Sequence, residues 1–246
     1  MSRPFLILQL RPEAEAADDE YAAILARGGL AAEATRRIRL DVEALPAGLD
    51  PGDYAGVIVG GGPGCVSDPP EDKDPVEARI EAAVLGLMPA VVGRDLPFLG
   101  CCYGIGILAH HLGAPVGKGR YGEAVGAADC RLTQAGTTDP LLAGMPERFA
   151  ALVGHKEAVE ALPEGCGHLV ASETCPFQMI RHGRNVYATQ FHPEADADSF
   201  ELRTRIYADR GYFEPGEAAG IVAAIRAADV SAPAAILKNF VARYRG

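Results

Sequence analysis

A cysteine, a histidine and a glutamate occupy positions from which they could act as nucleophile, base and orienting group. Cys102 follows a short apolar run and precedes a helix-like apolar pattern, in the segment Gly100-Cys101-Cys102-Tyr103-Gly104. His192 ends another apolar run, and Glu194 follows it two residues later. A carboxylate that binds one imidazole nitrogen leaves the other nitrogen to pair with a thiol, as covalent catalysis requires. These residues therefore predict a cysteine nucleophile.

The surroundings of Cys102 are typical of a nucleophile elbow, a tight strand–turn–helix connection usually written G-x-S-x-G. We expect glycine at positions 100 and 104 because a side chain there would clash where strand and helix approach each other. The strained turn should project the side chain of Cys102, and the helix N-terminus should lower the pKa of its thiol. The segment alone leaves open a tight turn that carries two buried cysteines.

Composition excludes several classes of protein. The net charge of −10 argues against nucleic acid as a partner. No apolar run reaches the length of a membrane span, and the N-terminus leads into a strand without a signal-peptide cleavage site. The six cysteines lack paired C-x-x-C spacing. We therefore expect no metal and no cofactor, and free thiols in a reducing cytoplasm.

Strand-length apolar runs and helical patterns alternate in the first part of the chain. Strands are expected at 5–10, 34–40, 56–59 and 96–99. Helices are expected from Asp18 or Asp19, as caps, to about Arg27, at 75–87, and after Cys102. This alternation predicts an α/β fold, a doubly wound, flavodoxin-like, mostly parallel sheet with helices on both faces. The glycine loop 60–64 and the elbow both follow strands, so they should share the carboxyl edge of the sheet.

After Gly113 the pattern changes to short strands separated by glycine or proline turns. Strands are expected at 124–132, 148–153, 168–172, 177–181 and 185–190. Part of this half should form a small antiparallel layer, with the strand at Val186 rejoining the main sheet. Helices are expected at 196–209, 218–228 and 232–244, the last capped by Ser231. Without a linker or repeat, residues 1–246 are predicted to form a single domain.

Three separated motifs resemble the class I, triad-type glutamine amidotransferase family: Gly61-Gly62-Pro63-Gly64, Gly100-Cys101-Cys102-Tyr103-Gly104 and Gln190-Phe191-His192-Pro193-Glu194. Their order matches the family as well, with 90 positions between nucleophile and base. The resemblance covers about residues 5–209 and is strongest to stand-alone domains like the amidotransferase half of GMP synthetase. Residues 210–246 would be a helical C-terminal extension without a recognised counterpart.

The resemblance implies that the protein hydrolyses glutamine through a thioester. Cys102 would attack the side-chain amide, His192 would move the proton, and Glu194 would orient the imidazole. The backbone N–H groups of Gly62 and Tyr103 would form the oxyanion hole, where loss of one donor typically costs about 10²–10³-fold in rate.

The predicted substrate pocket contains Gly61, Gly106 and His155. Gly106 departs from the family pattern C-x-G-x-Q, because it stands where the family has a glutamine that shapes the pocket. Either another group replaces this glutamine, or the substrate differs. The family's synthetase domain has no counterpart in this sequence, so we expect ammonia to pass to an acceptor on a separate synthase subunit.

Three functions stay open at this point. The first is a glutamine amidotransferase-like cysteine hydrolase that releases ammonia for an unidentified acceptor. The second is a cysteine hydrolase of another γ-glutamyl amide or peptide, which Gly106 favours. The third is a catalytically idle relative that binds a metabolite or a partner. The presence of Cys102, His192 and Glu194 together argues against the third.

Overall fold

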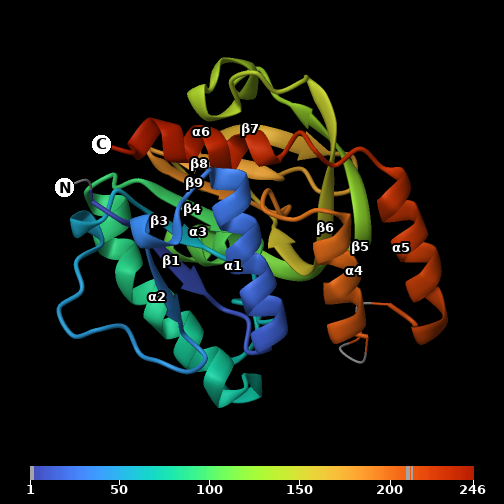
Figure 1. The fold of residues 1–246 in the computed structure, drawn as a ribbon, viewed down its shortest axis with the longest axis horizontal. Coiled ribbons are helices and arrows are strands. Elements are labelled where there is room, and N and C mark those ends of the chain that lie inside the picture. The colour runs from blue at the N-terminus through green and yellow to red at the C-terminus, as the bar shows by residue number, and fades with distance from the viewer. Residues whose placement is uncertain (1–2, 209–210, 212) are drawn as a thin grey trace.

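The computed structural model describes residues 3–208, 211 and 213–246, whose nine strands form one sheet in the order β2-β1-β3-β4-β9-β8-β7-β5-β6 (Figure 1). The strands are β1 (Phe5–Gln9), β2 (Thr35–Arg39), β3 (Gly56–Val59), β4 (Phe98–Cys101), β5 (Val116–Leu132), β6 (Arg148–Val159), β7 (Cys166–Ser172), β8 (Met179–His182) and β9 (Val186–Thr189). The helices are α1 (Ala14–Gly28), α2 (Pro75–Gly93), α3 (Tyr103–His111), α4 (Ala197–Ile206), α5 (Ala218–Ala227) and α6 (Ala234–Tyr244).

The sheet is mixed and has the predicted α/β character. Strands β2, β1, β3, β4 and β9 run parallel to one another, and β8, β7, β5 and β6 continue from β9 in antiparallel pairs. Val186 of β9 pairs with Phe98 of β4, so this strand rejoins the parallel part as expected. The antiparallel strands belong to the same sheet, and the long β5 and β6 extend it away from the parallel strands (Figure 1).

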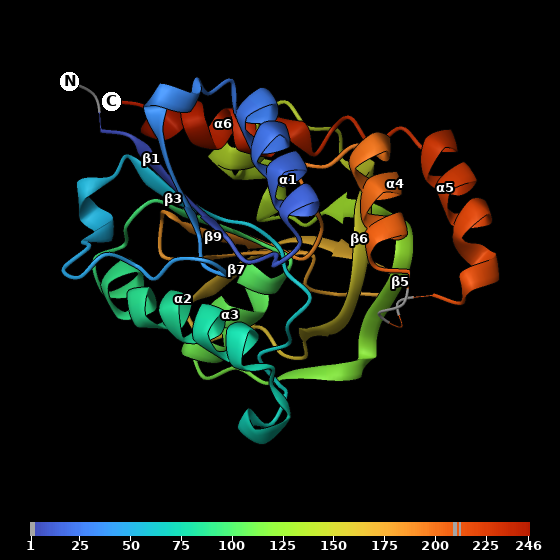
Figure 2. The same ribbon diagram turned by 60° about the horizontal axis from the view of Figure 1, so that its bottom comes forward.

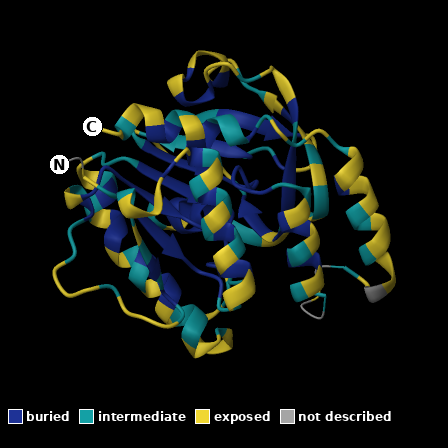
Figure 3. Ribbon diagram, in the orientation of Figure 1, coloured by how far each residue is buried: buried dark blue, intermediate teal, exposed yellow. Residues whose placement is uncertain are grey.

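Helices cover both faces of the parallel strands. Figure 2 shows α1 and α6 on one side of the sheet and α2 and α3 on the other. Leu6 and Leu8 of β1 belong to the core beneath α2 and α3, whereas Phe5 and Ile7 belong to the core beneath α1 and α6. Successive side chains of a strand point to opposite faces. A strand buried on both faces therefore needs the unbroken apolar run found at β1, and Figure 3 shows the strands buried beneath helices with exposed outer surfaces.

The start of α1 differs from the prediction. Asp18 and Asp19 do not cap this helix, because it begins at Ala14 with Glu13 at the N-cap. The other end is as predicted. Gly29 ends the helix in the left-handed region, with φ of 60°, and donates its N–H to the carbonyl of Ala26.

The ends of the C-terminal helices differ from those predicted from the sequence. Asp196 caps α4 by accepting the N–H of Ser199 at 3.0 Å, and the predicted end of that helix at residue 209 lies outside the described residues. Ser231 does not cap α6, because its hydroxyl binds Asp229 at 2.6 Å and Pro233 occupies the cap. Within the described part of the chain, none of these helices is long and apolar enough to cross a membrane.

Helix α6 contributes to the main core. Its residues Ile236, Leu237, Phe240 and Val241 are at most 2% exposed and pack in the cluster that includes Phe5 of β1. Figures 1 and 2 both place the C-terminus beside the N-terminal end of the chain. Helix α6 therefore shares one core with β1 and α1.

The parallel strands end at a common edge. Leu8 of β1 lies beside Val59 of β3, Val59 lies beside Gly100 of β4, and Gly100 lies beside Ala188 of β9. The segments that leave these strand ends carry Arg11, the glycine loop 60–64, Cys102 and His192. Loops at the carboxyl ends of adjacent parallel strands meet in space, which brings distant parts of the sequence to one site.

Candidate active site

Cys102 occupies the turn between β4 and α3 in a strained conformation. Its φ is 52°, and Asp95 is the other non-glycine residue with positive φ among those described. The Cys102 N–H donates to the carbonyl of Thr189 at 2.7 Å, which ties the elbow to the end of β9. The strained elbow predicted from the sequence is confirmed.

The two elbow glycines differ in their surroundings. A side-chain carbon on Gly100 would lie 3.0 Å from the backbone of Gly104, which agrees with the expected clash. A side-chain carbon on Gly104 would meet nothing closer than 3.9 Å. The expectation of a clash at Gly104 is therefore wrong, because the close approach lies on the strand side of the turn.

His192 is held by a carboxylate and an arginine. Its Nδ1 lies 2.8 Å from Oε1 of Glu194, and Arg203 of α4 donates to the same oxygen from Nη1 at 3.0 Å. A carboxylate only accepts hydrogen bonds, so Nδ1 carries the proton and Nε2 is the nitrogen that can accept one. Phe200 packs edge-on against the imidazole, with the ring centroids 5.3 Å apart. These contacts fix the orientation of the ring.

His192 and Cys102 meet around Gly61. A side-chain carbon on Gly61 would lie 2.7 Å from Cε1 of His192, 2.7 Å from Nη2 of Arg11 and 3.4 Å from Cβ of Cys102. Only glycine leaves room for this approach. The Gly61 N–H donates to Oε2 of the buried Glu20 at 3.2 Å. Gly61 therefore spaces the reactive groups, and its own N–H is already used within the protein.

Two adjoining pockets open at Cys102, with cavity volumes of about 40 and 20 Å³. We call them the Arg203 pocket and the Glu157 pocket. The Arg203 pocket is lined by Arg11, Gly62, Cys102, Val125, Gly154, His192, Phe200, Arg203, Thr204, Tyr207 and Phe213. The Glu157 pocket is lined by Gly62, Gly64, Cys65, Cys102, Tyr103, Gly106, Gly154, His155, Lys156, Glu157 and Gln190. Gly62, Cys102 and Gly154 are common to both pockets, so the thiol lies where they join.

Glu157 fills the space above Gly106. A side-chain carbon at position 106 would lie 2.7 Å from Oε1 of Glu157. The two carboxylate oxygens accept the N–H groups of Val66 at 3.0 Å and Ser67 at 2.7 Å. The buried carboxylate of Glu157, from β6, therefore occupies the space that a side chain at position 106 would need.

His155 lines the Glu157 pocket with both ring nitrogens engaged. Nδ1 lies 2.9 Å from the carbonyl oxygen of Glu157, and Nε2 lies 2.8 Å from Oε2 of Glu123. The ring therefore supports the pocket wall and has no nitrogen left for a substrate.

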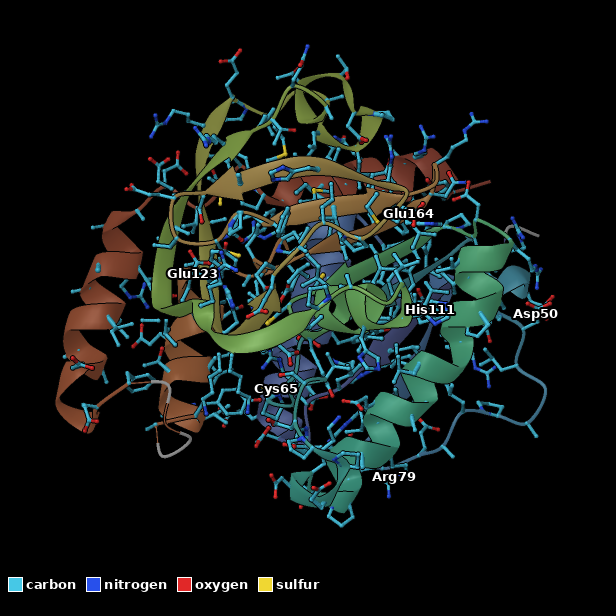
Figure 4. The ribbon with its side chains drawn as sticks, turned by 180° about the vertical axis from the view of Figure 1, so that it is seen from behind. Asp50, Cys65, Arg79, His111, Glu123 and Glu164 are labelled. Carbon is cyan, nitrogen blue, oxygen red and sulfur yellow. The ribbon has the colours of Figure 1, made fainter. Side chains whose placement is uncertain are left out.

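One buried cluster among the described residues brings metal-binding atom types within 4.8 Å of one another: Glu123, His155 and Cys175. Glu123 already accepts hydrogen bonds from His155, Ser172, Thr174 and Gln178. The carboxylate in this cluster is thus already well supplied with hydrogen-bond donors. Figure 4 shows Glu123 on the β5 side of the molecule, well apart from His111 at the end of α3.

The charges of the site depend on burial. Burial raises the pKa of the Cys102 thiol to about 11, although the positive charges of Arg11 and Arg203 oppose this shift. Burial also lowers the pKa of His192, against the influence of Glu194. Burial favours the neutral form of Glu194, but His192 and Arg203 outweigh it and hold the pKa of this carboxyl well below its usual range.

The resting site therefore contains a thiol beside a neutral imidazole and an ionised carboxylate. Burial outweighs the lowering expected from the helix N-terminus, so the net shift of the Cys102 pKa is upward.

Several charged residues at the site were not predicted from motifs. Arg11 and Glu20 form a buried ion pair at 2.8 Å, and Arg203 lies against Glu194. The sequence does indicate that Glu20 is buried. This residue falls at helical spacing on the apolar stripe of α1 that contains Ala16, Ala17 and Ile24. A carboxylate on an apolar stripe indicates a buried partner.

Comparisons with known proteins agree with this architecture. A family model described as "Glutamine amidotransferase class-I" matches residues 24–204. One of the subunits of the glutamine-hydrolysing GMP synthase of Natronomonas pharaonis is 31% identical over 164 residues, which cover 65% of this chain and 78% of that protein. The glutamine-hydrolysing GMP synthase of Thermosipho melanesiensis is 37% identical over 111 residues, which cover 45% of this chain but 21% of that protein. The matched region thus spans about a fifth of the latter's length.

Solved structures show the same fold. A glutamine amidotransferase from Thermotoga maritima has a TM-score of 0.75 at 20% identity, covering 98% of both chains. Another from Methylobacillus flagellatus has a TM-score of 0.75 at 20% identity, covering 99% of this chain and 94% of that one. The protein is therefore an α/β protein with the sheet of the glutamine amidotransferases. Together with the match over residues 24–204, this shows that the chain belongs to the glutamine amidotransferase class-I family.

Proposed function

We propose that the protein hydrolyses the side-chain amide of glutamine at Cys102 and passes the ammonia to an acceptor on a separate synthase subunit. The observation that carries this proposal is the meeting of Cys102 and His192 around Gly61, with Glu194 fixing the imidazole. The relatives are named as glutamine-hydrolysing GMP synthases, which supports the substrate, and one of them is a single subunit of such an enzyme, which supports the separate partner.

The reaction would begin with transfer of the thiol proton to Nε2 of His192 as sulfur attacks the amide carbon. The elevated pKa of Cys102 means that this base is needed, because little thiolate exists before substrate binds. The N–H groups of Gly62 and Tyr103 would stabilise the oxyanion. His192 would then protonate the leaving nitrogen, and ammonia would depart from a thioester. Water, deprotonated by His192, would release glutamate and restore the thiol.

The glutamyl part of the substrate would occupy the Glu157 pocket. Tyr103, the second proposed oxyanion donor, lines this pocket next to Cys102. Each oxygen of Glu157 accepts one backbone N–H, and a carboxylate oxygen has capacity for a second hydrogen bond. Glu157 can thus receive the α-ammonium group of glutamine. In this proposal it takes the place of the glutamine that the family has at position 106.

The test is labelling with a diazo-ketone analogue of glutamine, followed by mass spectrometry, alongside a glutamate-release assay. We expect one adduct, at Cys102, and no glutamate release by Cys102→Ala. The matched control is Cys101→Ala. Cys101 is 1% exposed and packs in the core, so its replacement should leave the labelling of Cys102 unchanged. A folded wild-type protein that shows neither an adduct nor glutamate release would refute the proposal.

A further inference from the structure

The two N–H groups proposed for the oxyanion hole come from different segments of the chain. Gly62 belongs to the loop that leaves β3, and Tyr103 begins α3 after β4. Both donors have to reach the same oxygen in the transition state, and a misplacement of about 1 Å can cost about 10²-fold in rate. The fold therefore has to hold this loop against the start of the helix.

The ring of Tyr103 provides a contact between the two segments. A side-chain carbon on Gly64 would lie 2.9 Å from Cε1 and 3.0 Å from Oη of Tyr103, and one on Gly62 would lie 3.3 Å from its Cδ1. The edge of the ring thus runs along the glycine loop, and Tyr103 is 5% exposed. Apart from Pro63 the loop 60–64 has no side chains, so its backbone rests directly on this ring.

The hydroxyl of Tyr103 is fixed by a carboxylate from α2. It donates to Oε2 of Glu81 at 2.5 Å, and Glu81 is 9% exposed. Burial and this hydrogen bond raise the pKa of Tyr103 above its ordinary value, so the phenol keeps the proton that it donates. Hydrogen bonds to a carboxylate are short and about twice as strong as those between neutral groups. The bond therefore fixes the far end of the ring.

The second oxygen of Glu81 is linked to the segment that follows the glycine loop. Lys73 donates from Nζ to Oε1 of Glu81 at 2.5 Å and to the carbonyl of Val66 at 3.2 Å. The side chains of Lys73 and Glu81 are 9% and 12% exposed, so salt screens this ion pair little. Val66 is also held from its other side, because its N–H donates to Glu157 at 3.0 Å. Glu81 thus connects the start of α3 to the chain just beyond the glycine loop.

Stability alone is a weak explanation for this ion pair. Apolar residues of similar volume are often as stabilising as a buried pair of charges. They would pack α2 against the loop, but they would not direct the ring of Tyr103, because a hydrogen bond depends on angle as well as distance. The place of Glu81 between Tyr103 and Lys73 therefore favours a role at the site.

We infer that Glu81 is a positioning residue of the oxyanion hole, which acts through Tyr103 and holds the N–H groups of Gly62 and Tyr103 where one oxyanion can accept both. The inference rests on the proposed thioester chemistry of Cys102. The described residues that line the two pockets at Cys102 do not include Glu81, so its effect on the reaction is indirect.

The test is the steady-state kinetics of glutamate release from glutamine by the intact protein and its Glu81→Met variant. The oxyanion forms only in the transition state, so kcat should fall about tenfold to hundredfold while KM stays within about twofold. The value of kcat is calculated per Cys102 that the diazo-ketone analogue labels, which removes unfolded protein from the comparison.

Alkylation of Cys102 by iodoacetamide provides a reaction of the same thiol without an oxyanion. Displacement at a saturated carbon needs no oxyanion hole, so the alkylation rates of Glu81→Met and the wild type should agree within about twofold. A general disturbance of the elbow would instead slow alkylation and glutamate release together.

Further variants separate positioning from packing. Glu81→Gln keeps an oxygen that can accept the hydroxyl of Tyr103, so it should retain most of kcat. Tyr103→Phe loses the same hydrogen bond while the pair of Glu81 and Lys73 stays intact, so it should reproduce the loss in kcat even if Glu81→Met fails to fold. In the Tyr103→Phe background, Glu81→Met should cause no further loss. The matched control is Arg79→Met, which removes an exposed charge from the same helix and should leave kcat unchanged.

The outcomes separate this inference from the proposed function. An unchanged kcat in folded Glu81→Met or in Tyr103→Phe overturns the inference. An equal loss from Glu81→Met in the wild-type and Tyr103→Phe backgrounds, a parallel loss of alkylation, or a similar loss in Arg79→Met also overturns it. In each of these cases, glutamate release and labelling by the wild type leave the proposed function intact. A wild type that neither releases glutamate nor takes up the label overturns the proposed function and the inference together.

Discussion

Gly106 and Glu157 share one small space, and a methyl group at position 106 tests this contact directly. The added carbon of Gly106→Ala would lie 2.7 Å from Oε1 of Glu157 but 3.5 Å from the side chain of Val66, so only the carboxylate has to move. The carboxylate accepts the N–H groups of Val66 and Ser67 at 3.0 and 2.7 Å. Moving it weakens at least one of these hydrogen bonds.

Two opposing contributions determine how much Gly106→Ala changes the free energy of unfolding. Replacing glycine by alanine inside a helix stabilises by about 1 kcal/mol, whereas losing a hydrogen bond to a charged group costs about 1.5–3 kcal/mol. Gly106→Ala should therefore lower the free energy of unfolding by about 0.5–2 kcal/mol. In a Glu157→Ala background nothing has to move. There the same substitution should raise the free energy of unfolding by up to about 1 kcal/mol.

The assay is urea unfolding of the wild type, the two single variants and the double variant, followed by circular dichroism. The change of sign between the two backgrounds is the expected result, and it isolates the contact from other effects of either substitution. In glutamate release, Gly106→Ala should raise KM more than it lowers kcat, because Glu157 lies in the acyl pocket. An equal effect of Gly106→Ala in both backgrounds would refute the reasoning.

Three further predictions concern the thiol, the core and the orienting carboxylate. Alkylation of Cys102 by iodoacetamide, followed by mass spectrometry, should accelerate with pH through the alkaline range toward its pKa of about 11, and a plateau near neutral pH would contradict this. Phe240→Ala should lower the free energy of unfolding by about 3–5 kcal/mol in urea, because this ring is fully buried against Phe5. Glu194→Gln should cost about 3–5 kcal/mol at pH 7 by leaving Arg203 without its carboxylate. Since the folded-state pKa of Glu194 is depressed, this difference from the wild type should be complete above pH of about 5 and shrink as pH falls below about 4, whereas a constant difference would contradict it.

The sequence predicts the parallel strands well, because a strand buried on both faces requires an unbroken apolar run. It also brings the motifs together, because loops at the carboxyl ends of adjacent parallel strands must meet. The start of α1 could not be predicted from the local sequence. The acidic segment that opens this helix resembles a loop in isolation, but its charges pair with distant arginines, Glu15 with Arg205 and Asp18 with Arg37. Such tertiary contacts are invisible to local patterns.

The charged groups that distinguish this site arise in the same way. Arg203 lies near His192 only because α4 follows β9 and packs beside its end, and Glu157 reaches Gly106 only because β6 crosses the elbow helix. Each reactive group stands in a short motif of its own, whereas Arg203 and Glu157 stand outside these motifs and reach the site through the packing of separate elements. Arg11 and Arg203 line one pocket at Cys102 and Glu157 lines the other, and all three stand outside the motifs that the sequence offered.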